Sequence, residues 1–119
     1  MSSDGMIRIM IIEDHPIFRI GLCELINQEV DLMVCGEAED VGKAWEDIQR
    51  LNPDMAIVDI SLKGRSGLEL IHQINNYKKD LPVLVLSMHD EALFAQRALR
   101  AGAKGYIMKK DASESVIII

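Results

Sequence analysis

Short apolar runs alternate with longer amphipathic segments over almost the whole chain. The runs are rich in Ile, Val, Leu and Met and are four to seven residues long, as is typical of strands. In the segments between them, apolar residues recur three and four positions apart, which is the spacing of one face of a helix. The sequence therefore predicts a regular alternation of strands and helices. The predicted strands are residues 6–12, 32–35, 55–58, 83–86 and 104–108.

Several of the predicted helices carry start or stop signals. Pro16 suits the first turn of the first helix, and Asp40 is a candidate N-cap for the second. Gly102 would end the fourth helix, at about residues 91–100, in a left-handed conformation. Residues 113–119 would begin a last helix that is cut off at the end of the chain. The side chains expected to face the core are Phe18, Gly21, Leu22, Leu25 and Ile26; Val41, Ala44, Trp45 and Ile48; and Ala92, Ala95, Ala98 and Leu99. In the third helix, Leu68, Ile71, Ile74 and Tyr77 are available for packing.

The first, third and fourth strands are continuously apolar and do not alternate with polar residues. This pattern indicates burial on both faces, hence a parallel sheet with helices on either side. Alternating elements joined by right-handed crossovers give a doubly wound α/β fold. We expect residues 1–119 to form one such domain, with a core that starts at about residue 6. In doubly wound sheets, functional groups gather at the carboxyl ends of the strands, beside the point where the strand order reverses.

Polar side chains follow four of the predicted strands. Glu13 and Asp14 follow the first strand, Asp59 the third, Ser87 the fourth and Lys109 the fifth. Taken singly, each of these residues is more often a helix cap, a turn residue or a solvated charge. Their coincidence at one edge of the predicted sheet favours a shared functional site.

Three carboxylates in one crevice repel one another and would partly neutralise unless a cation is present. A small set of oxygen ligands suits Mg²⁺, which keeps several waters and leaves room for a phosphate oxygen. Lys109 offers a point charge and Ser87 a hydroxyl donor. The sequence therefore predicts a magnesium site in which one of the acids carries a phosphoryl group.

The second strand ends with two further acids, Glu37 and Glu39. This strand belongs at the edge of the sheet if the strand order reverses between strands one and three, so these acids are not counted with the central site.

Composition restricts the partners and the compartment. The net charge of −6 makes this segment a poor ligand for phosphate backbones, which argues against direct binding to nucleic acid. No apolar run approaches the ~20 residues needed to span a bilayer, and the N-terminus carries no export signal, so no membrane is expected. Cys23 and Cys35 lie in apolar patterns, which favours reduced core thiols over a disulfide or a metal pair. We therefore expect a cytoplasmic domain.

Several segments of the chain form a recognisable series of motifs, namely residues 11–16, 53–54, 57–60, 66–69, 85–87 and 101–106 running into Lys109. In these segments, which follow one another in the right order and spacing from residue 7 to about residue 116, the chain resembles the receiver domain of bacterial two-component response regulators. That resemblance implies a CheY-like, flavodoxin-like fold with strand order 2-1-3-4-5. The start Glu-Asp-His and the end Gly-Tyr-x-x-Lys are similar to the NarL/FixJ (LuxR-type) subfamily.

This resemblance implies that Asp59 is the phosphoacceptor, taking a phosphoryl group from a sensor histidine kinase. Asp14 and Asp59 would bind Mg²⁺ directly, together with the backbone carbonyl of Ser61. Glu13 would act on the metal through water. The domain would be a phosphorylation-dependent switch and not an enzyme in the usual sense, catalysing only its own phosphoryl transfer and dephosphorylation.

The resemblance also assigns the residues that read out phosphorylation. Lys109 would pair with the phosphoryl oxygens, and Ser87 would hydrogen-bond to the phosphate. Tyr106 is the aromatic residue that would turn inward when Ser87 moves. The small face expected on the fourth helix fits either a loosely held helix that shifts between two positions or ordinary packing.

The lifetime of the phosphorylated state depends on how water reaches the phosphorus. Met88 stands where receivers often have Ala, and Lys63 where they often have a proline. Ser61 and His89 lie two positions after Asp59 and Ser87 in the sequence, at the mouth of the predicted site. We expect Met88, Ser61 and His89 to restrict or orient the attacking water and so to set the rate of dephosphorylation.

Regulators of this subfamily usually carry a helix-turn-helix domain after the receiver, so we expect one in the parent protein, absent here. DNA would be bound only through that domain, to control transcription, and a receiver homodimer is a further expected partner.

Three other functions fit the residues less well. A flavodoxin-like cofactor domain would need a phosphate-binding loop at residues 13–16, which are acidic in this chain. An aspartyl phosphatase would commonly have a second acid at position 61, and a silent pseudo-receiver would lack the full polar set.

Overall fold

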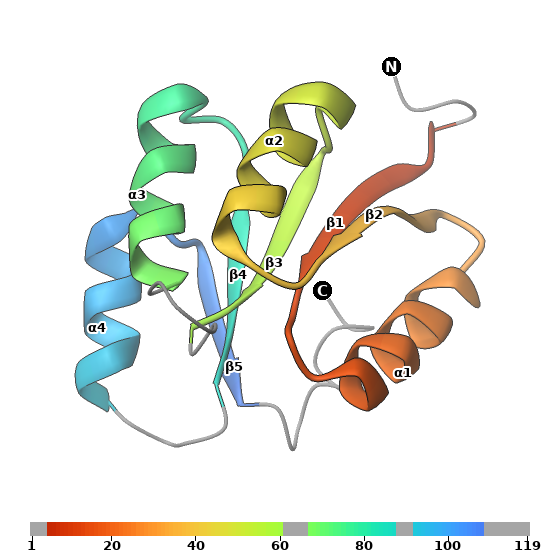
Figure 1. Cartoon of the computed structure of the whole chain (residues 1–119), viewed down its shortest axis with the longest axis horizontal. Helices are drawn as coiled ribbons and strands as arrows, with labels where there is room; N and C mark the ends of the chain where they lie inside the picture. The colour runs from red at the N-terminus through yellow and green to blue at the C-terminus, as the bar shows by residue number, and fades with distance from the viewer. Residues whose placement is uncertain (1–4, 61–66, 88–91, 109–119) are drawn as a thin grey trace.

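The computed structural model describes residues 5–60, 67–87 and 92–108, with the side chains of residues 92–95 and 108 left aside. Five parallel strands form one sheet in the order β2-β1-β3-β4-β5, which confirms the predicted doubly wound fold (Figure 1). Helices cover both faces of the sheet. The described elements are β1 (Ile7–Ile12), α1 (Pro16–Asn27), β2 (Leu32–Ala38), α2 (Val41–Leu51), β3 (Met55–Asp59), α3 (Gly67–Tyr77), β4 (Val83–Ser87), α4 (Ala92–Ala101) and β5 (Gly105–Met108).

Three strands continue beyond the ends predicted from the apolar runs. β2 reaches Ala38, three residues further than expected, because its backbone stays paired with β1 past an irregularity at Cys35. β3 and β4 include the polar residues Asp59 and Ser87, which pair with the neighbouring strand. The prediction ended β3 and β4 before their first polar side chain and β2 before Gly36, whereas backbone hydrogen bonding depends on neither the polarity nor the size of a side chain.

Two hydrophobic clusters sandwich the sheet. One lies beneath α2, α3 and α4 and the other beneath α1, and alternate residues of the central strands enter each. In β1, Met10 and Ile12 face the first cluster and Ile9 and Ile11 the second, all four at most 2% exposed. Burying each such side chain is worth ~1.5–3 kcal/mol, so the strand that ends at the predicted acidic site is firmly held.

Two of the predicted helix faces are partly wrong. In α1 the buried residues are Leu22, Cys23 and Ile26, whereas Gly21 is exposed. In α4, Ala98 is buried but Leu99 is half exposed. Each error shifts the buried stripe by one residue, or ~100° around a helix, which apolar spacing alone does not resolve.

The predicted helix signals inside the described segments are confirmed. The Oδ1 of Asp40 accepts from the backbone N–H of Lys43 at 2.9 Å, and Pro16 is the first residue of α1. Gly102 has φ of +119° directly after α4, and its N–H donates to the carbonyl of Leu99 at 3.1 Å. The predicted helix at residues 113–119 lies outside the described residues. In the part that the structure covers, every helix is too short or too polar to cross a bilayer.

Candidate functional site

The carboxyl ends of β1 and β3 bring three acidic residues together. Ile12 pairs with Val58 in the parallel register, so the residues that follow, Glu13 and Asp59, are neighbours across the two strands. Glu13 and Asp59 are fully buried, and the side chain of Asp14 is 6% exposed. One ligand atom from each acid, together with one from His15, lies within 4.8 Å of all the others. The structure thus gathers the predicted acids of strands one and three into a single cluster.

His15 belongs to this cluster, although it is not among the site residues predicted from the sequence. Its Nδ1 lies 2.9 Å from the Oε2 of Glu13 and 3.2 Å from the Oδ1 of Asp14. Its backbone N–H also donates to the same Oε2 of Glu13 at 3.0 Å. The side chain remains 54% exposed, so it lies between the buried acids and solvent. Its position next to Asp14, at the turn into α1, was the available sequence signal.

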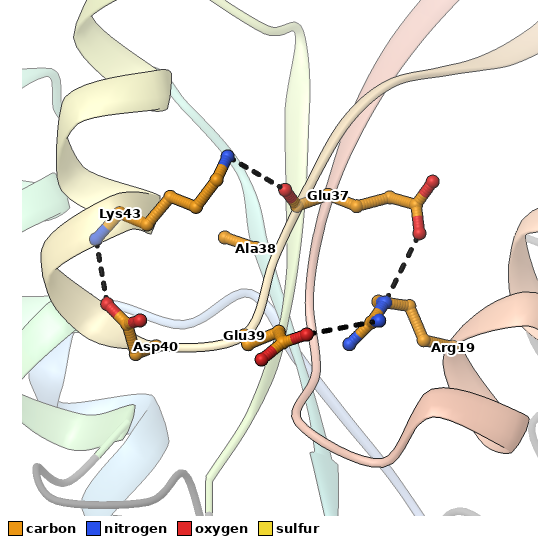
Figure 2. A pocket seen from close by; sticks show the side chains of 6 residues that line it. All are labelled: Arg19, Glu37, Ala38, Glu39, Asp40 and Lys43. Atoms are coloured by element: carbon orange, nitrogen blue, oxygen red, sulfur yellow. Dashed lines mark hydrogen bonds and ion pairs between the residues drawn. The ribbon is translucent and has the colours of Figure 1, made fainter.

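Arg19 is a second residue that sequence reasoning missed. Its Nη1 donates to the backbone carbonyl of Glu13 at 2.8 Å, and its side chain is only 14% exposed. Its Nε and Nη2 also lie 3.2 and 3.5 Å from carboxylate oxygens of Glu37 and Glu39. These residues line one hollow of about 200 Å³, and Figure 2 shows the guanidinium directed at both carboxylates. Lys43 lines the opposite side of this hollow, on α2. A single side chain of α1 therefore ties the loop after β1 to the end of β2.

Ser87 and Tyr106 lie on one face of the sheet. Ser87 is the last residue of β4, 3% exposed, and Tyr106 on β5 pairs with Val85. Because strand side chains alternate, Ser87 points to the same face of the sheet as Val85, two residues before it. Tyr106 is the register partner of Val85 and points to that face as well. Tyr106 is partly buried and packs against the cluster beneath α2, α3 and α4. The two residues are thus diagonal neighbours on that face.

Four predicted site residues lie outside the described residues, namely Ser61, Met88, His89 and Lys109. Lys109 directly follows Met108 in the sequence, and the backbone of Met108 pairs with Ser87. Ser61 follows Asp59 by two positions. The structure therefore describes the acidic part of the predicted site together with Ser87 and Tyr106.

The acidic cluster suits a divalent cation with oxygen ligands. Mg²⁺–O distances are about 2.1 Å, which puts opposite ligands of one ion about 4.2 Å apart. The 4.8 Å span of the cluster is close to that value, and three of its four residues are carboxylates. His15 fits less well as a ligand, since imidazole prefers transition metals and here lies against Glu13. The donor set therefore fits Mg²⁺ through the three carboxylates.

The fold and the cluster define the class: a doubly wound α/β domain with an acidic site where its strand order reverses. Residues 9–118 match the response regulator receiver domain, and the chain belongs to this family. Receiver domains are switches of two-component signalling and in general bind Mg²⁺ at an acidic cluster such as this one.

Several curated relatives of this chain are transcriptional regulators. It is 32% identical over 115 residues to the transcriptional regulatory protein DegU of Brevibacillus brevis, covering 97% of this chain and 49% of DegU. It is 33% identical to the oxygen regulatory protein NreC of Staphylococcus haemolyticus, covering 93% of this chain and 52% of NreC. The chain thus spans about half the length of these curated relatives. A solved LuxR-family response regulator from Aurantimonas superposes with a TM-score of 0.90 at 33% identity, over 95% of this chain and 81% of that one.

Proposed function

We propose that Asp59 accepts a phosphoryl group from a phosphohistidine of a sensor kinase, and later loses it to water. The observation that carries the proposal is the convergence of the fully buried Asp59 with Glu13 and Asp14 within 4.8 Å. Like-charge repulsion and desolvation make neighbouring buried carboxylates destabilise a fold, unless a bound cation offsets their negative charge. A cluster of this kind at the end of a central strand therefore supports a functional role over a structural one.

The proposed transfer is a displacement at phosphorus. A carboxylate oxygen of Asp59 forms the new O–P bond as the P–N bond to the kinase histidine breaks, and the electron pair of that bond stays on the imidazole nitrogen. The product is an acyl phosphate. Hydrolysis adds water at phosphorus, which returns the carboxylate and releases inorganic phosphate. A carboxylate is a weak nucleophile, so positioning and charge neutralisation supply most of the catalysis.

We assign charge neutralisation around Asp59 to a metal ion and to Lys109. Asp14 and Asp59 would hold Mg²⁺ directly with the carbonyl of Ser61, and Glu13 would hold it through water. When bound, the ion would offset the negative charge of the transferring group. Lys109 would pair with the phosphoryl oxygens.

The output of the switch would pass through Ser87 and Tyr106. A phosphoryl group on Asp59 would draw the hydroxyl of Ser87 into a hydrogen bond, and Tyr106 would fill the space left on the same face of the sheet. Their position beside α4 and β5 supports a change of that surface as the signal. In the parent protein, this change would act on a helix-turn-helix domain that binds DNA, directly or through a receiver homodimer. The length and names of the relatives support that part.

Mass spectrometry after incubation with acetyl phosphate and Mg²⁺ tests the proposal. The expected result is a gain of one phosphoryl group, ~80 Da. The gain should disappear in Asp59→Asn and in the presence of a chelator. Asp80→Asn, which changes an exposed acid after α3, is the matched control and should keep the gain. An unmodified wild-type protein, or a gain that persists in Asp59→Asn, would contradict the proposal.

A further inference from the structure

We propose that Arg19 is a positioning residue that holds the Glu13–Asp14 segment in the geometry needed to bind the metal ion. This inference rests on the proposed function, because it concerns the same site. The guanidinium uses three of its nitrogens: Nη1 on the carbonyl of Glu13, Nε on Glu37 and Nη2 on Glu39. An arginine is suited to this task because its donors form a rigid planar fork.

Arg19 makes the second of two hydrogen bonds that hold the backbone of Glu13, and we call this pair of hydrogen bonds the clamp. The N–H of Glu13 donates to the carbonyl of Ala38 at 3.0 Å, while its own carbonyl accepts from Arg19 at 2.8 Å. The two carboxylates that anchor Arg19 belong to Glu37 and Glu39, the residues on either side of Ala38 (Figure 2). Both peptide groups of Glu13 are therefore fixed by one segment at the end of β2.

The clamp matters because the acids follow the last paired residue of β1. Asp14 comes directly after the held carbonyl, so rotation of that peptide would move its carboxylate relative to Asp59. Metal sites lose affinity when the groups that orient their ligands are removed, typically by 10- to 100-fold. The same loss is expected here if the clamp opens.

The charge of Arg19 and its proposed positioning role predict opposite changes in metal affinity when the residue is replaced. A guanidinium next to a cation site repels the ion, so on charge alone its removal would tighten metal binding. If Arg19 positions the acids, its removal weakens binding instead. Arg19→Lys separates the charge effect from the positioning effect most cleanly. The positive charge is kept, but a single ammonium group cannot make the three contacts of the planar guanidinium.

Lys43 provides the matched control. It lines the same hollow and carries the same charge, but its described side-chain partners are the carbonyl of Glu37 at 3.5 Å and the Oδ2 of Asp47 at 2.7 Å. Its side chain is 55% exposed. Lys43→Met therefore changes the local charge without opening the clamp.

The test measures Mn²⁺ binding by electron paramagnetic resonance, with Mn²⁺ as the probe for the divalent site. We expect Arg19→Lys and Arg19→Met to weaken Mn²⁺ binding by about tenfold or more, and Lys43→Met to stay within about twofold of wild type. In acetyl phosphate assays, Arg19→Lys should raise the Mg²⁺ concentration for half-maximal phosphorylation while keeping the rate at saturating Mg²⁺. Wild-type affinity in Arg19→Lys, or tighter binding in Arg19→Met, would overturn the inference.

Two further measurements keep the outcome decisive. Asp14→Asn should lose Mn²⁺ binding; if wild type and Asp14→Asn bind alike, the metal site of the proposed function is itself wrong. Circular dichroism without metal shows whether each variant folds. If neither Arg19 variant folds, replacing Glu37 and Glu39 together by Ala removes the anchors from the other side. Unchanged affinity in that double variant would equally overturn the inference.

Discussion

Gly67, the first residue of α3, lies directly against the backbone of Asp59. Its N–H donates to the carbonyl of Ile60 at 3.2 Å, and a Cβ built on it would lie 2.6 Å from the carbonyl oxygen of Asp59 and 2.9 Å from the Cα of Ile60. Both are backbone atoms, which cannot rotate away as a side chain does. The start of α3 can therefore approach the proposed phosphoacceptor only because residue 67 has no side chain.

Gly67→Ala should push α3 and the end of β3 apart. We expect a loss of about 1–3 kcal/mol in the free energy of unfolding, as for other overpacked sites, and slower phosphorylation of Asp59. Urea unfolding and acetyl phosphate labelling measure the two effects. Gly21→Ala is the control, because a Cβ there meets nothing within 4 Å and an alanine inside α1 should stabilise by roughly 0.5–1 kcal/mol. If the two variants had the same free energy of unfolding and the same rate of phosphorylation, the close contact between residue 67 and the backbone of Asp59 would be unimportant.

Ser87→Ala should uncouple phosphorylation from the movement of Tyr106. A hydrogen bond to a charged group is worth about 1.5–3 kcal/mol, so its loss should reduce the shift toward the activated arrangement by roughly tenfold or more. The measurement is the NMR signal of the Tyr106 ring before and after acetyl phosphate. Ser87→Thr keeps the hydroxyl and should respond as wild type. A full response in Ser87→Ala would argue against Ser87 as the link.

Met88 and His89 should set how long the phosphoryl group lasts. Both follow Ser87, and we expect them, with Ser61, to restrict or orient the attacking water. The decay of phosphorylated Met88→Ala and His89→Ala is followed by mass spectrometry after acetyl phosphate is removed. A changed decay rate in at least one variant is expected, and unchanged rates in both would defeat the idea.

Asp47 should stabilise the fold at neutral pH but not in acid. Hydrogen bonds from Lys43, and then from Arg50, lower the pKa of this carboxyl below its usual 3.8. A lowered pKa contributes stability above pH ~4, which is lost as the pH falls through the folded-state value. Because both cations are largely exposed, we expect Asp47→Asn to cost only about 0.5–1 kcal/mol at pH 7. Urea unfolding should show that difference shrinking toward pH 2, and a constant difference would contradict the assignment.

Cys23 should react slowly with thiol reagents in the folded protein. Burial, and then the carboxylate of Glu37, raise the pKa of its thiol to about 11. At pH 8 the reactive thiolate should be about a hundredfold rarer than for a thiol of pKa 9. The raised pKa stabilises the fold below pH ~9, and that contribution is lost as the pH rises through 11. Labelling of a Cys35→Ser variant, native and in urea, measures the effect; equal rates would contradict it.

The sequence predicted the elements and the gathering of acids well because both follow from local rules. A two-residue period in Ile9–Ile12 places alternate side chains on the two faces wherever the strand lies. Parallel strands end at one edge, so Glu13 and Asp59 had to be neighbours once their strands were adjacent. Leu99 was misplaced because neighbouring residues of a short apolar stripe are equivalent in spacing alone.

The order of residues along the chain was enough to predict the alternation of strands and helices, the doubly wound fold and which acids end the central strands. The contacts that support those acids depend instead on how the elements pack. Arg19 meets Glu37 and Glu39 from 18 and 20 positions away, and Gly67 meets Asp59 across the start of α3. Such contacts depend on the distances and angles between packed elements, whereas periodicity along the chain reports only which side of its own element a residue faces.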